Sequence, residues 1–511
     1  MAGGDFQVVR GGRVLDAAQR AAQPADILIE RGTIREIGAP GLAAPENARP
    51  VDATDRILIP GLINAHTHAH GNLGKGLGDR WTLELLLNAA PWISGRRAQA
   101  DKYLTALIGA VEMLQKGCTA CYDLFMEFPL PSADGMAALG RAYQDAGMRA
   151  VVAPMMADRS FYQAIPGLLE ALPDRLRGEV ERIVYHTGDD NLAACRALLQ
   201  SWPFDREFVR PALAPTIPLH CADDFMVKAA ELAREYDIGY HTHVGESKVQ
   251  AVTGLRKYGC TLTAHLDQLG ILASNFVAAH AVWLDDDDIK RMADRGAAVA
   301  HNPGSNMRLG SGIAAVRKMR AANLAVGVGT DGANCADNQN MFEAMRLASF
   351  ASKVRGPDHR TWLTTDEVLG MATEGSARVI GFAGKLGRLA PGYLADIVFL
   401  DRRHVNWTPL NDVVNQLVHT EDGAAVDKVM VGGRIVVEGG RCITVDLDRL
   451  SDQAAEAAER LRGANQEARR LALALEPAIS AFCLGLARAP YHIHHYGGPP
   501  GIDAAEPPLH P

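Results

Sequence analysis

The sequence lacks the features that direct a protein to secretion or to a membrane. Its 511 residues include only eight cysteines, too few for the disulfide framework of a secreted protein. The first residues have neither the basic start nor the apolar core of a signal peptide. No uninterrupted apolar run has the length of a membrane-spanning segment. We therefore expect a cytoplasmic protein without a membrane partner.

Basic residues are fewer than acidic residues. Lys and Arg number 52 against 60 Asp and Glu, which gives a formal net charge of −8 at pH 7. Proteins that bind nucleic acid carry a basic patch or stripe, so we exclude nucleic acid as a partner. What is abundant is apolar residues, at 48%, enough for one large core and a smaller domain. Cys118 and Cys121 form a lone Cys-x-x-Cys pair, which we interpret as buried strand residues in preference to a redox or zinc site.

Short apolar strands alternate with long amphipathic helices through residues 59–385. This alternation predicts an α/β protein whose central part is a parallel (β/α)8 barrel of the TIM type. Reactive residues of such a barrel gather at the carboxyl ends of its strands. The eight predicted strands are 59–66, 117–124, 148–154, 208–214, 237–243, 276–283, 297–301 and 324–330.

Two β-rich segments flank the predicted barrel. Residues 1–58 and 386–445 consist of short β-rich runs between Gly-containing turns, and we expect them to pair into one small β-sandwich domain. The last part, 446–511, begins with one or two predicted helices over 449–480. It ends in a tail containing Tyr-His-Ile-His-His-Tyr at 491–496. These histidines are candidate metal ligands, but we favour a surface or subunit contact.

Histidines and an aspartate mark the ends of four predicted strands. His66 and His68 follow the first strand two residues apart, a spacing that turns both to one face. Two imidazoles that converge on one point begin a metal site, although alone they are equally consistent with ordinary hydrogen-bonded histidines. His243, His280 and Asp331 end three further predicted strands. The coincidence of all these placements favours the metal site.

The sequence resembles the amidohydrolase superfamily, in particular its deaminases and chlorohydrolases of nitrogen heterocycles. This branch includes methylthioadenosine/S-adenosylhomocysteine deaminases, guanine deaminases and triazine hydrolases. The resemblance extends to about residue 445. Its motifs are Pro-Gly-Leu-Ile-Asn-Ala-His-Thr-His (60–68), His-x-x-Glu (243–246), His280, His-Asn-Pro-Gly-Ser-Asn (301–306) and Gly-Thr-Asp-Gly (329–332).

The resemblance implies that His66, His68, His243 and Asp331 hold one divalent metal per subunit, with Zn²⁺ preferred to Fe²⁺. His243 is chosen over His241 because it precedes Glu246 by three residues, as the family's ligand does. The stretch 210–216 contains no lysine. Two-metal members usually have a lysine there that forms a bridging carbamate, so its absence favours a single metal.

The resemblance also implies the catalytic roles. A bound divalent cation lowers the pKa of its water and supplies the attacking hydroxide. Asp331 takes the proton of that water, and Glu246 protonates the ring nitrogen before passing a proton to the leaving group. His280 orients the hydroxide or stabilises developing charge. A structural salt bridge is the alternative role for Glu246.

Four residues are candidates for binding the substrate. Trp81 is placed to stack on a flat ring, and Glu84 resembles the position at which nucleoside-type members hold ribose hydroxyls. Asn306 and Asn334 lie in loops expected near the metal. Core packing, a solvated helix surface and loop capping are the respective alternatives. The stretch 213–218 lacks the histidine of adenosine-type members, which disfavours an adenine nucleoside and favours the triazine branch.

The predicted activity is hydrolytic deamination of an amino-substituted nitrogen heterocycle, a small-molecule substrate. Hydrolysis of an amide, urea or carbamate bond, or dechlorination or deamination of a triazine, is an alternative at the same site. A catalytically inactive binding protein is a minor alternative. We further expect a homo-oligomer, either a dimer or a tetramer, because this branch commonly forms them.

Overall fold

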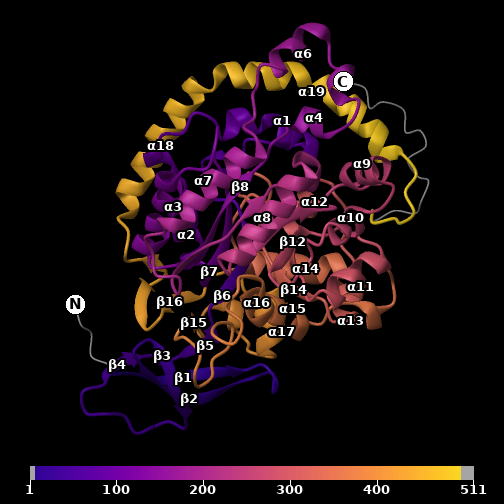
Figure 1. Cartoon of the computed structure of the whole chain (residues 1–511). Helices are drawn as coiled ribbons and strands as arrows, with labels where there is room; N and C mark the ends of the chain where they lie inside the picture. Colours follow the sequence, from indigo (N-terminus) through magenta and orange to yellow (C-terminus); the bar gives the residue numbers. More distant parts are fainter. Residues whose placement is uncertain (1–5, 497–511) are drawn as a thin grey trace.

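Parallel strands form the centre of the computed structural model, which describes residues 6–496 (Figure 1). One parallel sheet has the order β10-β8-β7-β6, with β9 also paired to β8, and a second has the order β11-β12-β13-β14. A bridge between Leu213 and Tyr240 joins the two sheets. At their other edges the Asp331 amide donates to the His66 carbonyl at 2.9 Å. The strands are β6 (Leu62–Thr67), β7 (Cys118–Met126), β8 (Arg149–Met156), β9 (Val209–Pro211), β10 (Ala214–Pro215), β11 (Tyr240–Val244), β12 (Phe276–His280), β13 (Ala298–His301) and β14 (Ala325–Val328).

Helices connect these strands and cover their outer side. Apolar residues recur at helical spacing along one face of these helices, as the alternation of strands and amphipathic helices predicts. The helices are α1 (Leu83–Ile93), α2 (Gln99–Gln115), α3 (Ala133–Ala146), α4 (Phe161–Ala164), α5 (Leu168–Ala171), α6 (Asp174–Val180), α7 (Gly188–Gln200), α8 (Asp223–Glu235), α9 (Lys248–Tyr258), α10 (Leu262–Gln268), α11 (Asp286–Asp294), α12 (Pro303–Arg308), α13 (Val316–Ala321), α14 (Met341–Lys353), α15 (Thr365–Gly370) and α16 (Ser376–Val379).

The predicted strand 59–66 is in fact two strands. β5 (Arg56–Pro60) ends at Pro60, and β6 begins at Leu62. Gly61 lies so close to Thr119 that a Cβ would overlap its side chain, and its amide donates to the Asp396 carbonyl at 3.0 Å. The chain therefore passes from one sheet to another at Gly61. The predicted strand 276–283 is also shorter than expected, because positive φ angles of 68° and 49° at His280 and Ala281 turn the chain.

Strands from both flanks lie in one nine-stranded sheet with the order β18-β17-β16-β15-β5-β1-β2-β3, in which β4 also pairs with β1. The antiparallel pairing of β5 with β15 joins the two flanks. Folding of this sheet into two sandwich layers, and the division into domains, stay predictions. The strands are β1 (Phe6–Asp16), β2 (Ala21–Glu30), β3 (Thr33–Gly38), β4 (Arg49–Asp52), β15 (Ile397–Asp401), β16 (Val426–Val431), β17 (Arg434–Glu438) and β18 (Arg441–Cys442), and α17 (Val413–His419) connects β15 to β16.

A buried ion pair ties this sheet to the parallel strands. Arg149, at the start of β8, donates from Nε to the Asp396 carboxylate at 3.1 Å, and a second nitrogen of the same guanidinium donates at 3.3 Å. The Gly432 amide adds a third bond to this carboxylate at 2.8 Å. Because both charged groups are buried and hydrogen-bonded, removing either would leave an unpaired charge in the interior.

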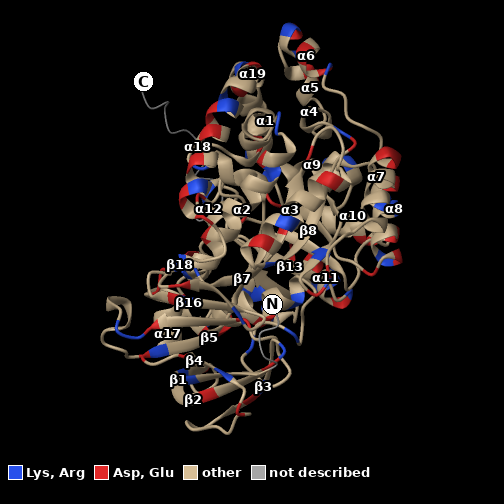
Figure 2. Ribbon diagram, turned by 90° about the vertical axis from the view of Figure 1, so that its left-hand side faces the viewer, with Lys and Arg blue, Asp and Glu red and all other residues tan. Residues whose placement is uncertain are grey.

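The C-terminal part contains α18 (Leu447–Ala464) and α19 (Gln466–Arg488). Figure 1 shows both helices curving around the outside of the molecule, past α1 and α9. By length and composition alone, α19 is apolar enough to cross a membrane, although Glu476 and Pro477 interrupt its apolar run. Its buried residues Leu475, Ile479 and Cys483 recur every four positions, which gives the helix one core-facing stripe. Over the outer helices Lys and Arg are interspersed with Asp and Glu (Figure 2).

Candidate metal and active site

The four predicted metal ligands meet at the carboxyl ends of the parallel strands. His66 lies in β6 and His68 just beyond it, His243 lies in β11, and Asp331 follows β14. The Oδ1 atom of Asp331 lies 3.4 Å from Nε2 of His66 and 3.2 Å from Nε2 of His68. Nε2 of His243 lies 3.2 Å from Nε2 of His68. All four residues are buried.

Hydrogen bonds on the far sides of two imidazoles fix their tautomers. Nδ1 of His68 lies 2.6 Å from the Leu124 carbonyl oxygen, and Nδ1 of His243 lies 2.6 Å from the Thr216 carbonyl oxygen. A carbonyl only accepts, so each Nδ1 carries the hydrogen and each Nε2 presents a lone pair. Two lone pairs 3.2 Å apart next to a carboxylate form an arrangement that a cation between them would stabilise. The residues therefore fit a divalent metal bound by nitrogen and oxygen ligands.

The protonation states agree with this fit. Burial lowers the pKa of His66 to about 3, and burial is also the main reason that the pKa of His243 lies well below its usual value. For Asp331, burial acts to raise the pKa, but the hydrogen bond from His66 and the nearby imidazoles hold it well below its ordinary value. Neutral imidazoles and an ionised carboxylate are the forms that bind a metal.

The surroundings of His241 differ from those of His243. It is fully buried, and its ring lies 4.6 Å from the Tyr122 ring and 4.9 Å from the His66 ring, between ring centres. Neither of its ring nitrogens has a hydrogen-bond partner among the described residues. The groupings of possible metal ligands within residues 6–496 include His243 and omit His241. They also omit the histidines of the tail.

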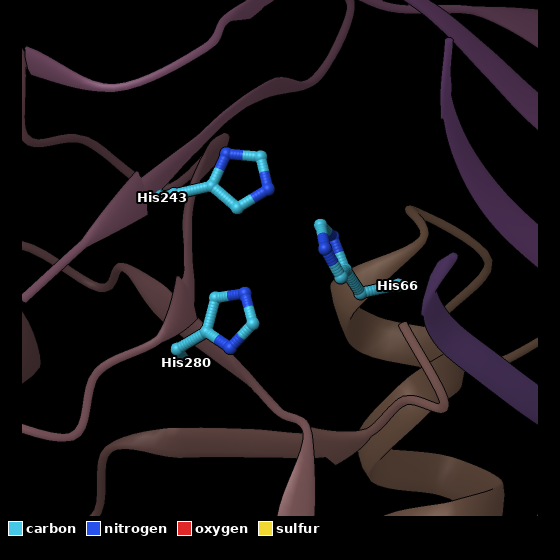
Figure 3. Close-up of side chains that lie close together, drawn as sticks. All are labelled: His66, His243 and His280. Atoms are coloured by element: carbon cyan, nitrogen blue, oxygen red, sulfur yellow. The ribbon is translucent and has the colours of Figure 1, made fainter. Parts of the chain in front are cut away.

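Glu246 and His280 lie on the same side of Asp331. Nε2 of His280 is 3.6 Å from Oε2 of Glu246 and 3.8 Å from Oδ2 of Asp331. Figure 3 shows the rings of His280 and His243 turned toward His66. Burial, the Asp331 charge and the Glu84 charge raise the pKa of Glu246 well above its usual value. A protonated Glu246 can give a proton to a group bound beside the metal ligands.

Glu246 is held by the loop between β11 and α9. Its amide donates to Oε1 of Gln250 at 3.1 Å. The next residue, Ser247, caps α9 by accepting a hydrogen bond from the Gln250 amide at 3.2 Å. Gly245 precedes Glu246 with a φ of 57°, a left-handed conformation that glycine adopts at little cost. A cap and a glycine turn thus set the course of the backbone from which the Glu246 side chain projects.

Two polar residues, Asn306 and Gln339, hold the site together. The sequence did not predict a supporting role for either. The Asn306 Oδ1 atom accepts a hydrogen bond from Nδ1 of His280 at 2.9 Å, so Asn306 orients His280 in this structure; its amide nitrogen has no partner among the described residues. The Gln339 side chain lies 2.7 Å from the Thr67 hydroxyl and donates to the Asp331 carbonyl at 2.9 Å. It therefore ties the segment carrying the first two histidines to the segment carrying the aspartate.

A small apolar cavity of about 10 Å³, enough for about one water, lies between α1, α4 and α9. It adjoins the Glu246 loop through Gln250, which lines it and accepts a hydrogen bond from the Glu246 amide. Glu84 is the carboxylate in its wall, and its Oε1 accepts a hydrogen bond from the Ser247 hydroxyl at 2.7 Å. The remaining wall residues are Leu83, Leu87, Phe161, Ile165, Leu219, His220, Val249 and Gln250. Sequence reasoning named only Glu84, because the other residues are scattered and mostly apolar.

Among the described residues, Trp81 and Asn334 make packing contacts only, and none of these contacts indicates a role in ligand binding. The half-buried Trp81 ring packs on Leu83, Leu309 and Cys335, and lies 6.2 Å from the Trp92 ring. The Asn334 side chain fills the space beside Gly71, where a Cβ would overlap it. Both contacts are those of packed loop residues, and their role in substrate binding stays a prediction.

Comparison with known proteins identifies the family to which the chain belongs. The family model described as "Amidohydrolase family" matches residues 57–436. The chain is 34% identical over 458 residues to a 5'-deoxyadenosine deaminase of Methanothermobacter thermautotrophicus, covering 89% of this chain and 99% of that protein. It is 34% identical over 440 residues to a 5-methylthioadenosine/S-adenosylhomocysteine deaminase of Desulforudis audaxviator, covering 85% and 94%.

Solved structures are similar along nearly the whole chain. An adenosine deaminase from Xanthomonas campestris with bound zinc has a TM-score of 0.79 at 25% identity and covers 89% of this chain and 98% of its own. An atrazine chlorohydrolase from Arthrobacter aurescens complexed with zinc has a TM-score of 0.79 at 28% identity, covering 88% and 99%. The resemblance drawn from the sequence motifs is confirmed.

Proposed function

Because the chain belongs to the amidohydrolase family, we propose that it is a metal-dependent hydrolase that replaces an amino group of a nitrogen heterocycle with oxygen from water. The observation that carries this proposal is the convergence of two fixed Nε2 lone pairs with the carboxylate of Asp331, beside the buried carboxyl group of Glu246. The relatives named deaminases support the same reaction.

His66, His68, His243 and Asp331 would hold the metal. When bound, it would lower the pKa of a water molecule so that the water could lose a proton and serve as the nucleophile toward the ring carbon. His280 donates from Nδ1 to Asn306, so its Nε2 atom accepts a hydrogen bond and orients the attacking water. Glu246, kept protonated by burial and neighbouring charge, donates its proton to the ring nitrogen next to the reacting carbon. Asp331 takes the proton released by the attacking water, and the now ionised Glu246 receives that proton and carries it to the departing amino group.

For the substrate we propose an adenine nucleoside with an uncharged 5' substituent. The relatives' names support the adenine nucleoside, in place of the triazine preference that the histidine-free stretch 213–218 suggested. Glu84 offers a buried carboxylate for ribose hydroxyls, and the cavity wall around it contains no Lys or Arg. A wall without Lys or Arg offers no partner for the carboxylate of an amino acid zwitterion, so an uncharged group such as a methyl or methylthio group is favoured. The cavity has room for about one water, so its wall side chains must move apart to admit such a group.

Several finer features belong to the same proposal. The two parallel sheets form one closed (β/α)8 barrel, flanked by a β-sandwich. One Zn²⁺ per subunit is favoured over Fe²⁺, and the zinc named in similar structures supports this choice. The enzyme is a cytoplasmic homo-oligomer.

Metal analysis combined with an ammonia-release screen tests the proposed function. The screen covers 5'-deoxyadenosine, 5'-methylthioadenosine, adenosine, guanine and amino-triazines, with Glu246→Gln as the inactive control. We expect a bound divalent metal and ammonia from 5'-modified adenosines that depends on Glu246. Metal without ammonia, together with acid or amine release from amides, ureas or carbamates, would replace deamination by the alternative reaction at this site.

A further inference from the structure

The C-terminal tail segment, defined here as Tyr491–Tyr496, folds back onto the strand-end loops of its own chain. It follows α19 and lies outside the residues matched by the family. The rings of Tyr491, His495 and Tyr496 lie 6.1, 5.6 and 5.1 Å from the Trp283 ring, between ring centres. Trp283 is fully buried. Three rings of the tail segment thus surround a single tryptophan.

Trp283 connects the loops that carry the active-site residues. Its backbone amide donates to the carbonyl of Gly245, the residue before Glu246, at 2.8 Å. Its indole Nε1–H donates to the Ser311 carbonyl at 2.8 Å. The Ser311 amide in turn donates to the Asn306 carbonyl at 2.8 Å. Through its main chain and its indole, Trp283 therefore links the position of Glu246 to the residue that orients His280.

The tail segment is fixed against these loops by several further contacts. The His495 carbonyl accepts a hydrogen bond from the Ile313 amide at 2.7 Å, and the His495 ring is hydrogen-bonded to Arg355 at 3.0 Å. A Cβ at Gly312 would lie 2.9 Å from the His495 carbonyl oxygen, so the segment sits directly on this glycine. The Lys248 ammonium, at the start of α9, lies 5.9 Å from the Trp283 ring centre and 6.0 Å from that of Tyr496, within cation–π range.

We propose that Tyr491, His495 and Tyr496 are positioning residues, which act through Trp283 to hold the carboxyl group of Glu246 for proton transfer. The need for such support follows from Gly245, whose φ of 57° gives the Glu246 loop a turn without side-chain restraint. Proton transfer requires the donor within hydrogen-bond distance of the accepting nitrogen, and a displacement of about 1 Å can cost roughly 100-fold in rate. This inference rests on the proposed function.

The test is a Tyr491→Ala/Tyr496→Ala double variant in the full chain. We expect kcat to fall about 10–100-fold, while KM changes less than about threefold and the metal content is kept. The Tyr491→Phe/Tyr496→Phe variant keeps both rings on Trp283 and should recover most of kcat. The matched control is Tyr258→Ala, which removes a tyrosine–histidine ring contact of 3.7 Å at the other end of α9 and should leave kcat unchanged.

Hydrogen exchange at the amides of residues 245–250 is measured in parallel and needs no substrate. We expect faster exchange in the double alanine variant and wild-type exchange in Tyr258→Ala. Unchanged exchange and unchanged kcat would overturn the inference, as would a raised KM with kcat intact or a loss of metal that accounts for the loss of rate. If the unaltered enzyme releases no ammonia from any heterocycle, the proposed function fails, and the exchange result still decides whether the tail segment supports the Glu246 loop.

Discussion

The strand ends that hold the metal ligands and the cavity beside Glu84 are built by different parts of the chain. At the strand ends, His68 and His243 are oriented by backbone carbonyls of Leu124 and Thr216, which no substitution removes. In the cavity, Glu84 is oriented by the side chain of Ser247, and the wall consists of side chains from α1, α4, α9 and a loop. Two of the predicted metal ligands are thus oriented by main-chain atoms, whereas the surroundings of Glu84 depend on side chains that substitution can change.

Breaking the strand-end site should have the largest effect. His243→Ala removes a nitrogen whose partner across the site is His68 at 3.2 Å, so we expect the purified protein to lose its metal and all measurable turnover. His241→Ala, the matched control two residues earlier, should keep most of the metal because no grouping of possible metal ligands within residues 6–496 includes His241. Elemental analysis and ammonia release measure both. The opposite pattern in the two variants would assign the ligand to His241.

Removing only the proton donor should separate chemistry from metal binding. Glu246→Gln keeps the shape of the side chain and eliminates its acid, so kcat should fall by about 10²–10⁴-fold. Metal content and KM should stay close to wild type, since Glu246 is oriented by its own loop and not by the metal ligands. Steady-state kinetics with metal analysis tests this expectation. Retained kcat would remove Glu246 from the mechanism.

A smaller effect is expected from the residue that orients His280. Asn306→Ala deletes the acceptor of the 2.9 Å bond from Nδ1 of His280, which frees the tautomer and the ring orientation. Loss of a supporting hydrogen bond of this kind typically costs about 10–100-fold, and we expect that loss in kcat with the metal kept. Asn411→Ala, an exposed asparagine elsewhere, serves as control. A rise in KM alone would return Asn306 to the predicted role in substrate binding.

The same contrast explains what the sequence could predict. His66 and His68, or His243 and Glu246, are neighbours in the chain, and their spacing relative to an apolar strand fixes where they project. The bond between His280 and Asn306 joins different loops, and Gln339 contacts Thr67 from 272 positions away. No local pattern reports such pairs. The residues of a cavity wall are even harder to predict from the sequence, because apolar residues there have the same sequence pattern as core residues.

The sandwich and barrel predictions show a related limit. The sequence predicts a single strand over 59–66, whereas the chain changes sheets at Gly61. The reason is a tertiary contact, the packing of Gly61 against Thr119, which a single sequence does not display. Element types were predictable from periodicity, but the partner of each strand was not.

On the cavity side, Glu84→Gln should alter affinity more than rate. The buried carboxylate is proposed to accept hydrogen bonds from ribose hydroxyls, and bonds to a charged group contribute about 1.5–3 kcal/mol. We therefore expect KM for a nucleoside to rise about 10-fold or more, with kcat within about threefold. Assaying the free base is the control, because it has no ribose and its KM should not change. A fall in kcat with KM unchanged would place Glu84 in the proton-transfer chemistry beside Glu246.

The smallest effect expected comes from His220, which lines the same cavity. Burial and the Lys257 charge lower the pKa of His220 to about 4, whereas the unfolded chain has a pKa near 6.5. As pH falls below that unfolded value, the unfolded chain gains a proton that the folded protein excludes, so the free energy of unfolding decreases. Between pH 7 and 5.5 this decrease amounts to about 1 kcal/mol for one such group. His220→Gln should remove that part of the pH dependence, while His186→Gln, at an exposed position, should retain it. Denaturant titrations of wild type and the two variants at both pH values measure the free energy of unfolding. If its change between pH 7 and 5.5 were the same in His220→Gln as in wild type, the His220 imidazole would be hydrated in the folded state.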